Sequence, residues 1–254
     1  MAEDPRSTRE LYDQSAASWT RKQPSSVSDF TARPAVLALC QPIAGKRVLD
    51  LGCGEGYCAR QLRAAGASRV LGVDISSSMI ESAVQQELRE PLGIEFAQAD
   101  AGELVELAGA EFDVVLAMFL FNYLTTERMT ACMLEVMRLL APGGRFVFAV
   151  PHPALPWMRR AEPPFYFDVR ERRYFEARNA RFAGKIWKRD GVQLDVQLVH
   201  KTVEDYFTSL REAGFNRMPL LRELRVTPEI SAVDPEFFAP LTEVPLHLAF
   251  AIER

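Results

Sequence analysis

The sequence predicts an α/β fold, a doubly wound and mostly parallel sheet with helices on both faces. Strand-like apolar runs alternate with helix-like stretches over residues 46–150, as parallel βαβ units require. A glycine-rich turn over residues 52–56, with the sequence Gly-Cys-Gly-Glu-Gly, directly follows the first run and precedes a helix-like stretch. The 254 residues are 48% hydrophobic, which is enough for one large domain with a substantial core.

Composition excludes several classes of function. A net charge of −4 argues against a general nucleic-acid binder, and no segment approaches the ~18 consecutive apolar residues of a membrane helix. The first residues, Met1–Arg6, lack the basic and apolar parts of a secretory signal. Four cysteines are scattered without metal-ligand spacing and indicate reduced thiols: Cys40, Cys53, Cys58 and Cys132. We therefore expect a cytoplasmic protein, a monomer or homodimer, without nucleic-acid or membrane partners.

The expected elements can be placed in chain order. Strands are predicted at Val48–Asp50, Arg69–Val73, Ile94–Ala99, Phe112–Met118 and Arg145–Val150. Helices are predicted from a Ser78–Glu81 capping box to about Leu88, over Glu127–Leu140 before the turn 141–144 (Ala-Pro-Gly-Gly), and from a Thr202 cap to Ala213. Two further apolar stretches follow, around Met218–Leu224 and Leu246–Ile252.

The glycine turn and the acids beside it form the first candidate site. A strand, a glycine loop at a helix N-terminus and an acid after the next strand, Asp74, predict a site for a ribose-bearing cofactor. The spacing departs from the dinucleotide fingerprint, because Tyr57 stands where a third glycine is required. Asp50 would repel a pyrophosphate but attract a ligand that carries an ammonium and a sulfonium.

The pattern Asp-x-Gly-x-Gly-x-Gly, followed by Asp74, resembles the class I S-adenosylmethionine-dependent methyltransferases of the small-molecule type. The resemblance implies the Rossmann-like seven-stranded fold of that family, S-adenosylmethionine as cofactor and S-adenosylhomocysteine as product. It also implies that Asp50 and the loop hold the methionine moiety, Asp74 the ribose hydroxyls and Asp100 the adenine amine. The cofactor-binding residues expected are Tyr12, Asp50, Gly52, Cys53, Gly54, Gly56, Asp74, Ile75, Met79, Asp100, Ala101, Ala117 and Met118.

A single methyltransferase domain is expected over residues 1–254. Its parts are an N-terminal helical lid (1–45), a cofactor-binding core (46–150), an inserted substrate-covering flap (151–201) and a C-terminal helix with strands that complete the sheet (202–254). The segment Leu11–Trp19 is similar to a lid sequence of the family, although an amphipathic helix packed on the sheet would show the same spacing. Arg33 could reach the cofactor carboxylate, but a surface position is favoured.

The flap is rich in aromatic and basic residues. The runs 181–188 and 192–199 predict a hairpin around Asp190-Gly191. Such a flap at the carboxyl edge of the sheet suits a substrate cover, and basic residues that face the pocket would indicate an anionic substrate. A solvated hairpin or a dimer contact remains the alternative. The substrate-binding residues expected are Trp19, Phe119, Asn122, Trp157, Phe165 and Tyr166.

Catalytic candidates are His152, His200 and Tyr123. His152 follows the fifth strand, and the segment 198–207 around His200 is similar to one in the family whose histidine points into the active site. Buried structural histidines are the alternative, and His247, inside the last apolar stretch, is expected to be structural. No Asp/His metal constellation is visible, so metal-independent transfer is expected.

The sequence thus predicts transfer of a methyl group to a small-molecule acceptor, a secondary or other metabolite, by in-line displacement. A nicotinamide-dependent oxidoreductase on the same sheet, a protein or peptide methyltransferase, and a non-catalytic cofactor-binding partner remain as alternatives.

Overall fold

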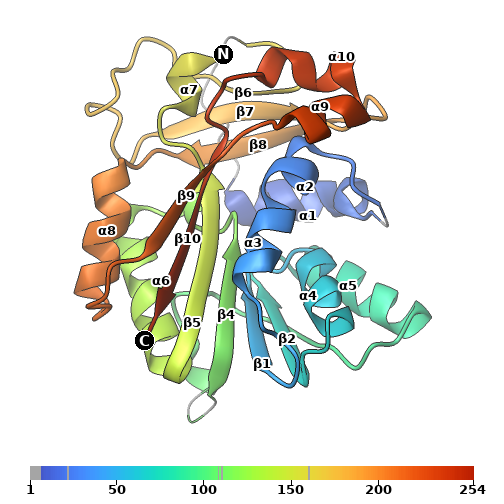
Figure 1. Ribbon diagram of the computed structural model, residues 1–254, viewed down its shortest axis with the longest axis vertical. Coiled ribbons are helices and arrows are strands. Elements are labelled where there is room, and N and C mark those ends of the chain that lie inside the picture. The colour runs from blue at the N-terminus through green and yellow to red at the C-terminus, as the bar shows by residue number, and fades with distance from the viewer. Residues whose placement is uncertain (1–6, 22, 108, 110, 160) are drawn as a thin grey trace.

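The computed structural model describes residues 7–21, 23–107, 109, 111–159 and 161–254. Residues 1–6, to which the prediction about a secretory signal applies, lie outside this range. A seven-stranded sheet with the order β3-β2-β1-β4-β5-β10-β9 forms the body of the molecule (Figure 1). Its strands are β1 (Arg47–Leu51), β2 (Arg69–Asp74), β3 (Glu95–Gln98), β4 (Phe112–Met118), β5 (Leu140–Pro151), β9 (Leu220–Leu224) and β10 (His247–Glu253).

The pairing of the strands confirms the predicted doubly wound, mostly parallel sheet. β1 pairs in parallel with β2 on one side and β4 on the other, while β10 runs antiparallel between β5 and β9. The central strands are buried on both faces, which explains their nearly continuous apolar sequences. Because the chain continues from β1 first to β2 and later to β4, a crevice opens at the carboxyl end of β1.

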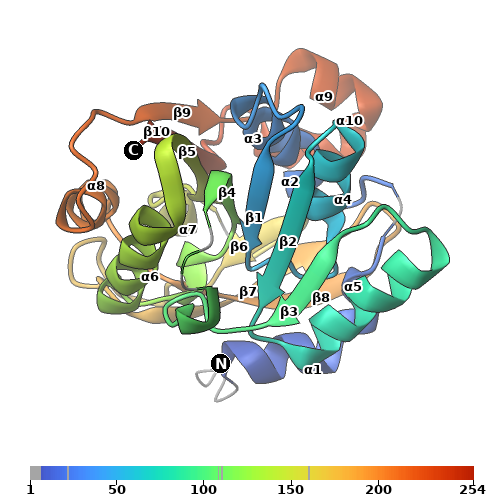
Figure 2. The ribbon, with the colours of Figure 1, turned by 90° about the horizontal axis from the view of Figure 1, so that it is seen from below.

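Helices cover both faces of the sheet (Figure 2). One core unites the sheet with α6 (Thr126–Leu139) and α8 (Val203–Glu212). A second core unites the opposite face with α3 (Arg33–Leu39) and α4 (Tyr57–Ala64). The remaining helices are α1 (Thr8–Trp19), α2 (Val27–Thr31), α5 (Ser77–Arg89), α7 (Leu155–Met158), α9 (Pro228–Val233) and α10 (Pro235–Phe238).

The inserted segment forms a sheet of its own above the carboxyl ends of the central strands (Figure 1). The predicted hairpin is confirmed as β7 (Arg181–Trp187) and β8 (Gln193–Val199), and β6 (Phe165–Phe167) adds a third antiparallel strand. The small sheet has its own apolar core, which includes Leu155, Phe182 and Phe238. One face of the hairpin packs on this core, whereas the other carries exposed polar residues such as Arg181 and Asp195, as the alternative of a solvated charged face predicts.

Two element boundaries differ from the sequence prediction. Helix α5 is capped by Ser76, whose extended backbone lets its hydroxyl accept from the Met79 N–H, while Ser78 lies inside the helix. The Pro-Gly-Gly turn lies within β5, because Leu140 already pairs with Phe112 before the register shifts. Gly143 has a φ of 73° within this irregular stretch.

The ring of Phe96 on β3 lies against two glycines of the cofactor-loop region. A Cβ added to Gly56 would lie 2.7 Å from the ring, and one added to Gly72 on β2 would lie equally close. Gly56 also has a φ of 84°. The third glycine of the loop is therefore required by the fold, since both its backbone conformation and this ring exclude a side chain.

Gly56→Ala is expected to lower the free energy of unfolding by roughly 1–3 kcal/mol more than Gly45→Ala, because only the first variant overpacks Phe96. Gly45 is a matched control, since it has a φ of 75° and open space around its Cβ position. Urea unfolding of both variants measures the difference. Phe96→Leu should recover part of the loss in the Gly56→Ala background; equal losses for the two glycines would contradict this account.

Candidate functional site

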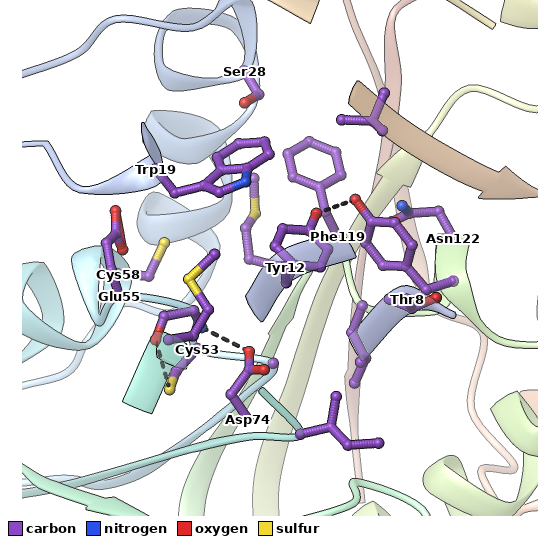
Figure 3. A pocket seen from close by; sticks show the side chains of 18 of the residues that line it. Thr8, Tyr12, Trp19, Ser28, Cys53, Glu55, Cys58, Asp74, Phe119 and Asn122 are labelled. Carbon is purple, nitrogen blue, oxygen red and sulfur yellow. Dashed lines mark hydrogen bonds between the residues drawn. The ribbon is translucent and has the colours of Figure 1, made fainter. Parts of the chain in front are cut away.

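A cavity of about 400 Å³ lies at the carboxyl edge of the sheet (Figure 3). Its wall is built from the loop after β1, the ends of β2 and β4, helix α1 and the small sheet. It brings together sixteen of the residues expected from sequence. They are Tyr12, Trp19, Asp50, Gly52, Cys53, Gly54, Asp74, Ile75, Met79, Asp100, Ala101, Met118, Phe119, Asn122, Tyr123 and Phe165.

The glycine loop presents bare backbone to this cavity. Gly52 and Gly54 both have left-handed φ values, of 68° and 56°. Nothing lies within 4 Å of the position that a Cβ on Gly54 would take. The loop therefore leaves a cradle that a side chain would fill and that a ligand can approach closely.

Asp50 is a buried carboxylate without a counterion in direct contact. It is 0% exposed, and within the described part of the chain neither of its oxygens has a hydrogen-bond partner, although the Ala59 N–H lies near enough to favour the charged form. Burial, with the neighbouring Asp74 and Glu55, raises the pKa of Asp50 to about 8. An ammonium group in the cavity would satisfy this carboxylate, so the site fits the cofactor that the sequence resemblance implies.

Asp74 is held at the mouth of the crevice by two backbone donors. Its Oδ2 accepts from the Gly54 N–H at 2.9 Å, and its Oδ1 accepts from the Ser76 N–H at 2.9 Å. The Ile75 N–H also favours the charged form of Asp74. A carboxylate has about four lone-pair sites, so these donors leave it capacity to accept from a ribose hydroxyl. Burial raises the pKa of this group, against the effect of the backbone donors.

Asp100 lies on the cavity wall but is already engaged. Its Oδ2 pairs with the Arg128 guanidinium, and its Oδ1 accepts from the Gly102 N–H at 2.9 Å. An adenine amine would therefore compete with a cation for this carboxylate. The role expected for Asp100 from the family resemblance stays a prediction.

Helix α1 lies over the cavity and is fastened on both sides. The Tyr12 hydroxyl is hydrogen-bonded to the Tyr123 hydroxyl, and the two rings meet edge to face at 5.4 Å. Asp13 accepts from the Ser76 hydroxyl at 2.5 Å, which ties α1 to the N-terminus of α5. The Trp19 ring lies 5.5 Å from that of Tyr12. Tyr12 and Trp19 thus lie on the cavity wall, as expected of a lid.

A buried charge network that sequence reasoning did not anticipate lies beside the loop. Arg33 donates to Asp29 at 2.8 Å, and Arg21 pairs with both Asp29 and Glu55. The Arg33 side chain is only 13% exposed and lies on the cavity wall, so the favoured surface position was wrong. The i,i+4 spacing of Asp29 and Arg33 was the signal available in the sequence.

The far end of the cavity is aromatic and apolar. Phe119, Phe165 and Phe167 line it, with Ile186 and Val196 from the small sheet. His247, expected to be purely structural, also lines it, with its ring 5.0 Å from that of Phe119. A strand antiparallel to β5 must begin at the carboxyl edge of the sheet, and this was the signal that could have placed His247.

Six residues expected in the site do not line the cavity. Strand alternation explains two of them, because Tyr166 faces away from Phe165 and Ala117 away from Met118. Gly56 lies under Phe96, and Trp157 packs at 4.6 Å from the His200 ring. The two histidines, His152 and His200, complete the set.

The histidines are held elsewhere by their own hydrogen bonds. His152 lies 3.1 Å from the Glu223 carboxylate on β9, and its Nδ1 accepts from the Ala154 N–H. His200 contacts the Tyr174 carbonyl at 2.9 Å through Nε2, and burial lowers its pKa to about 4. Both positions correct the expectation that these rings face the pocket.

The residues that follow His200 are structural as well. Lys201 is 1% exposed and donates to the Leu124 and Val199 carbonyls, which ties β8 to the loop after β4. Thr202 and Asp205 form the capping box of α8. The segment 198–207, which resembles an active-site motif, thus contacts the cavity wall indirectly, through the hydrogen bond of Lys201 to Leu124.

Among the residues that the structure describes, no group of three or more His, Cys, Asp or Glu side chains is placed to hold a metal ion. Within the same residues, no helix is long and apolar enough to cross a membrane.

Comparison with protein families gives a match to a methyltransferase domain over residues 48–144. This region contains the glycine loop, Asp74 and Asp100. The chain is 32% identical over 109 residues to a ubiquinone biosynthesis O-methyltransferase of Nitrosococcus oceani, covering 42% of this chain and 44% of that enzyme. It is 30% identical over 163 residues to a demethylmenaquinone methyltransferase of Clavibacter sepedonicus, covering 63% and 64%. The chain thus spans less than two thirds of either quinone enzyme.

A solved structure extends the likeness over nearly the whole domain. An S-adenosylmethionine-dependent methyltransferase from Mesorhizobium loti superimposes with a TM-score of 0.65 at 25% identity, covering 87% of this chain and 96% of that one.

Asp50→Asn is expected to raise the melting temperature of the unliganded protein more at pH 9 than at pH 5. The folded-state pKa of Asp50, about 8, lies above its unfolded value of about 3.9, so its contribution to stability falls as pH rises between them. Near pH 5 the Asp50 carboxyl of the folded protein is mostly neutral, so replacing it with an amide changes the melting temperature less. Asp195→Asn, which alters a half-exposed carboxylate on β8, serves as control; a gain in melting temperature that is the same at both pH values would refute the burial of an uncompensated carboxylate.

Proposed function

Because this chain belongs to the class I S-adenosylmethionine-dependent methyltransferases, we propose that it methylates a small, planar organic acceptor without a metal ion. The observation that carries the proposal is the cavity itself, which joins an acidic, glycine-lined end to an aromatic end. The nicotinamide and non-catalytic alternatives are set aside, because the matched domain and the superimposed structure are methyltransferases.

The residues at the acidic end suit the cofactor. S-adenosylmethionine, when bound, supplies a methyl group on a positively charged sulfur. Asp50 would hold the amino group of its methionine part, Gly52 and Gly54 would contact it through bare backbone, and Asp74 would accept from the ribose hydroxyls. Tyr12 and Tyr123, joined above the loop, would close the site against water.

The aromatic end suits a flat, largely apolar acceptor. Phe119, Phe165 and Phe167 provide faces against which a ring can stack. Two relatives act in quinone pathways according to their names, which is consistent with a ring-bearing acceptor. The work of the protein would then be to align the acceptor's nucleophilic atom with the methyl group and exclude water.

Asp74→Ala is expected to weaken S-adenosylhomocysteine binding by roughly 1.5–3 kcal/mol, the scale of hydrogen bonds to a charged group. Gly54→Val is expected to abolish binding in a folded protein, because its side chain would fill the cradle. Calorimetric titration measures both, with Asp195→Ala as the matched carboxylate control. Wild-type affinity in Asp74→Ala would mean that this residue does not bind the ribose.

The acceptor class is tested by incubating the protein with methyl-labelled S-adenosylmethionine and two pools. One pool holds hydroxylated aromatic and quinol compounds, and the other holds peptides and unfolded protein. We expect label in the first pool only, and its loss in the Gly54→Val variant. Label confined to the second pool would replace the small-molecule proposal with a peptide methyltransferase.

A further inference from the structure

His247 occupies a position in the cavity that the proposed roles above leave unused. It is the first residue of β10 and pairs with Pro151 at the carboxyl end of β5. Its ring lies 5.0 Å from that of Phe119 and, nearly parallel, 6.3 Å from that of Phe165. An imidazole between two aromatic rings thus faces the end of the cavity assigned to the acceptor.

A neighbouring threonine fixes which nitrogen of His247 carries the proton. Thr31, on α2, donates its hydroxyl hydrogen to the Val27 carbonyl at 2.9 Å. Its oxygen can therefore only accept from the Nδ1 of His247, which lies 3.4 Å away. Nδ1 carries the hydrogen, and Nε2 is left as a hydrogen-bond acceptor. Because Thr31 is off the cavity wall and His247 is on it, the ring edge that bears Nε2 faces the cavity.

The surroundings keep this imidazole neutral. Burial, with the charges of Arg33 and His152, lowers the pKa of His247 to about 3. Arg33 lies on the same wall, 5.7 Å from the centre of the Phe119 ring. A cation here opposes protonation of the histidine and favours an electron-rich oxygen on a ligand.

Phe119 adopts a strained backbone at the same place. Its φ is 58°, which is costly for a bulky residue, and its N–H is fixed by a 3.0 Å hydrogen bond to the Ala149 carbonyl. This conformation turns the ring onto the cavity wall beside His247. Strain of this kind persists where a site needs a particular side-chain position.

We propose that His247 selects the acceptor: its Nε2 accepts a hydrogen bond from a hydroxyl group on a planar ring that lies against Phe119 and Phe165. This inference rests on the proposed function and names its acceptor class, hydroxylated aromatic compounds. Thr31 is a positioning residue, because it acts only through the tautomer of His247. The Arg33 guanidinium stabilises the oxygen of the acceptor's hydroxyl group as that oxygen becomes more negative.

The test compares two ring probes of similar size in the presence of S-adenosylhomocysteine at pH 6. 4-Nitrophenol can donate a hydrogen bond, whereas 4-nitrotoluene cannot. We expect wild-type protein to bind the phenol about tenfold more tightly, as one hydrogen bond to a desolvated acceptor allows. His247→Phe, which keeps an aromatic ring, should lose this preference, and His152→Gln, outside the cavity, should keep it.

The tautomer is read separately by nitrogen NMR, since the chain holds three histidines and His247→Phe assigns the signal. We expect the hydrogen on Nδ1 in wild-type protein and in Thr31→Ser, and a mixture in Thr31→Val. A hydrogen on Nε2, no phenol binding, or no preference for the phenol would each overturn the inference. Calorimetry with S-adenosylhomocysteine on the same samples distinguishes these outcomes from failure of the cofactor site.

Discussion

The position of β1 between two parallel neighbours is the constraint on which the molecule depends. Because β2 and β4 flank it, the loop after β1 opens into the crevice at the carboxyl edge of the sheet. The same arrangement buries Asp50 at the end of the strand, where its oxygens find no hydrogen-bond partner among the residues that the structure describes. A carboxyl group whose ionisation is unfavourable is thus built into the centre of the fold, and a bound cation would favour its charged form.

The roof of the cavity comes from segments far apart in sequence that hold one another. Lys188, at the end of β7, donates to the Ser18 carbonyl, and Arg189 donates to that of Ser25 at 2.9 Å. Asp13 joins α1 to the cap of α5 beside Asp74. The small sheet and the N-terminal helices therefore close the cavity together, because each provides the other's hydrogen-bond partners.

Sequence periodicity predicted those parts of the fold that local chemistry determines. The run Phe112–Met118 matches β4 because a strand buried on both faces must be apolar throughout, and Thr202 caps α8 through a local motif. Long-range pairing determines what was missed. His247 enters the site only because β10 inserts antiparallel beside β5, and no local pattern records that neighbour.

In the candidate site too, residues that belong to a local motif were easier to predict than residues that long-range pairing brings together. Residues near the glycine loop were found because cofactor recognition uses consecutive backbone and one acid, which leave a motif. The aromatic end of the cavity is assembled from α2, β4, β6 and β10, so its residue types carry no shared spacing. His152 and His200 were predicted to lie in the cavity and do not. Both follow the end of a strand, but the direction of each ring depends on its hydrogen-bond partner, which is Glu223 for His152 and Tyr174 for His200.

All four cysteines are free and buried, and burial raises the pKa of each thiol. Reactive thiolate therefore forms only when the surrounding structure opens. Cys53 and Cys58 flank the cradle at Gly54, whereas Cys132 lies on the face of α6 that is buried in the core. The rate of alkylation at Cys53 and Cys58 consequently reports local opening of the loop. The rate at Cys132 reports unfolding of the whole domain.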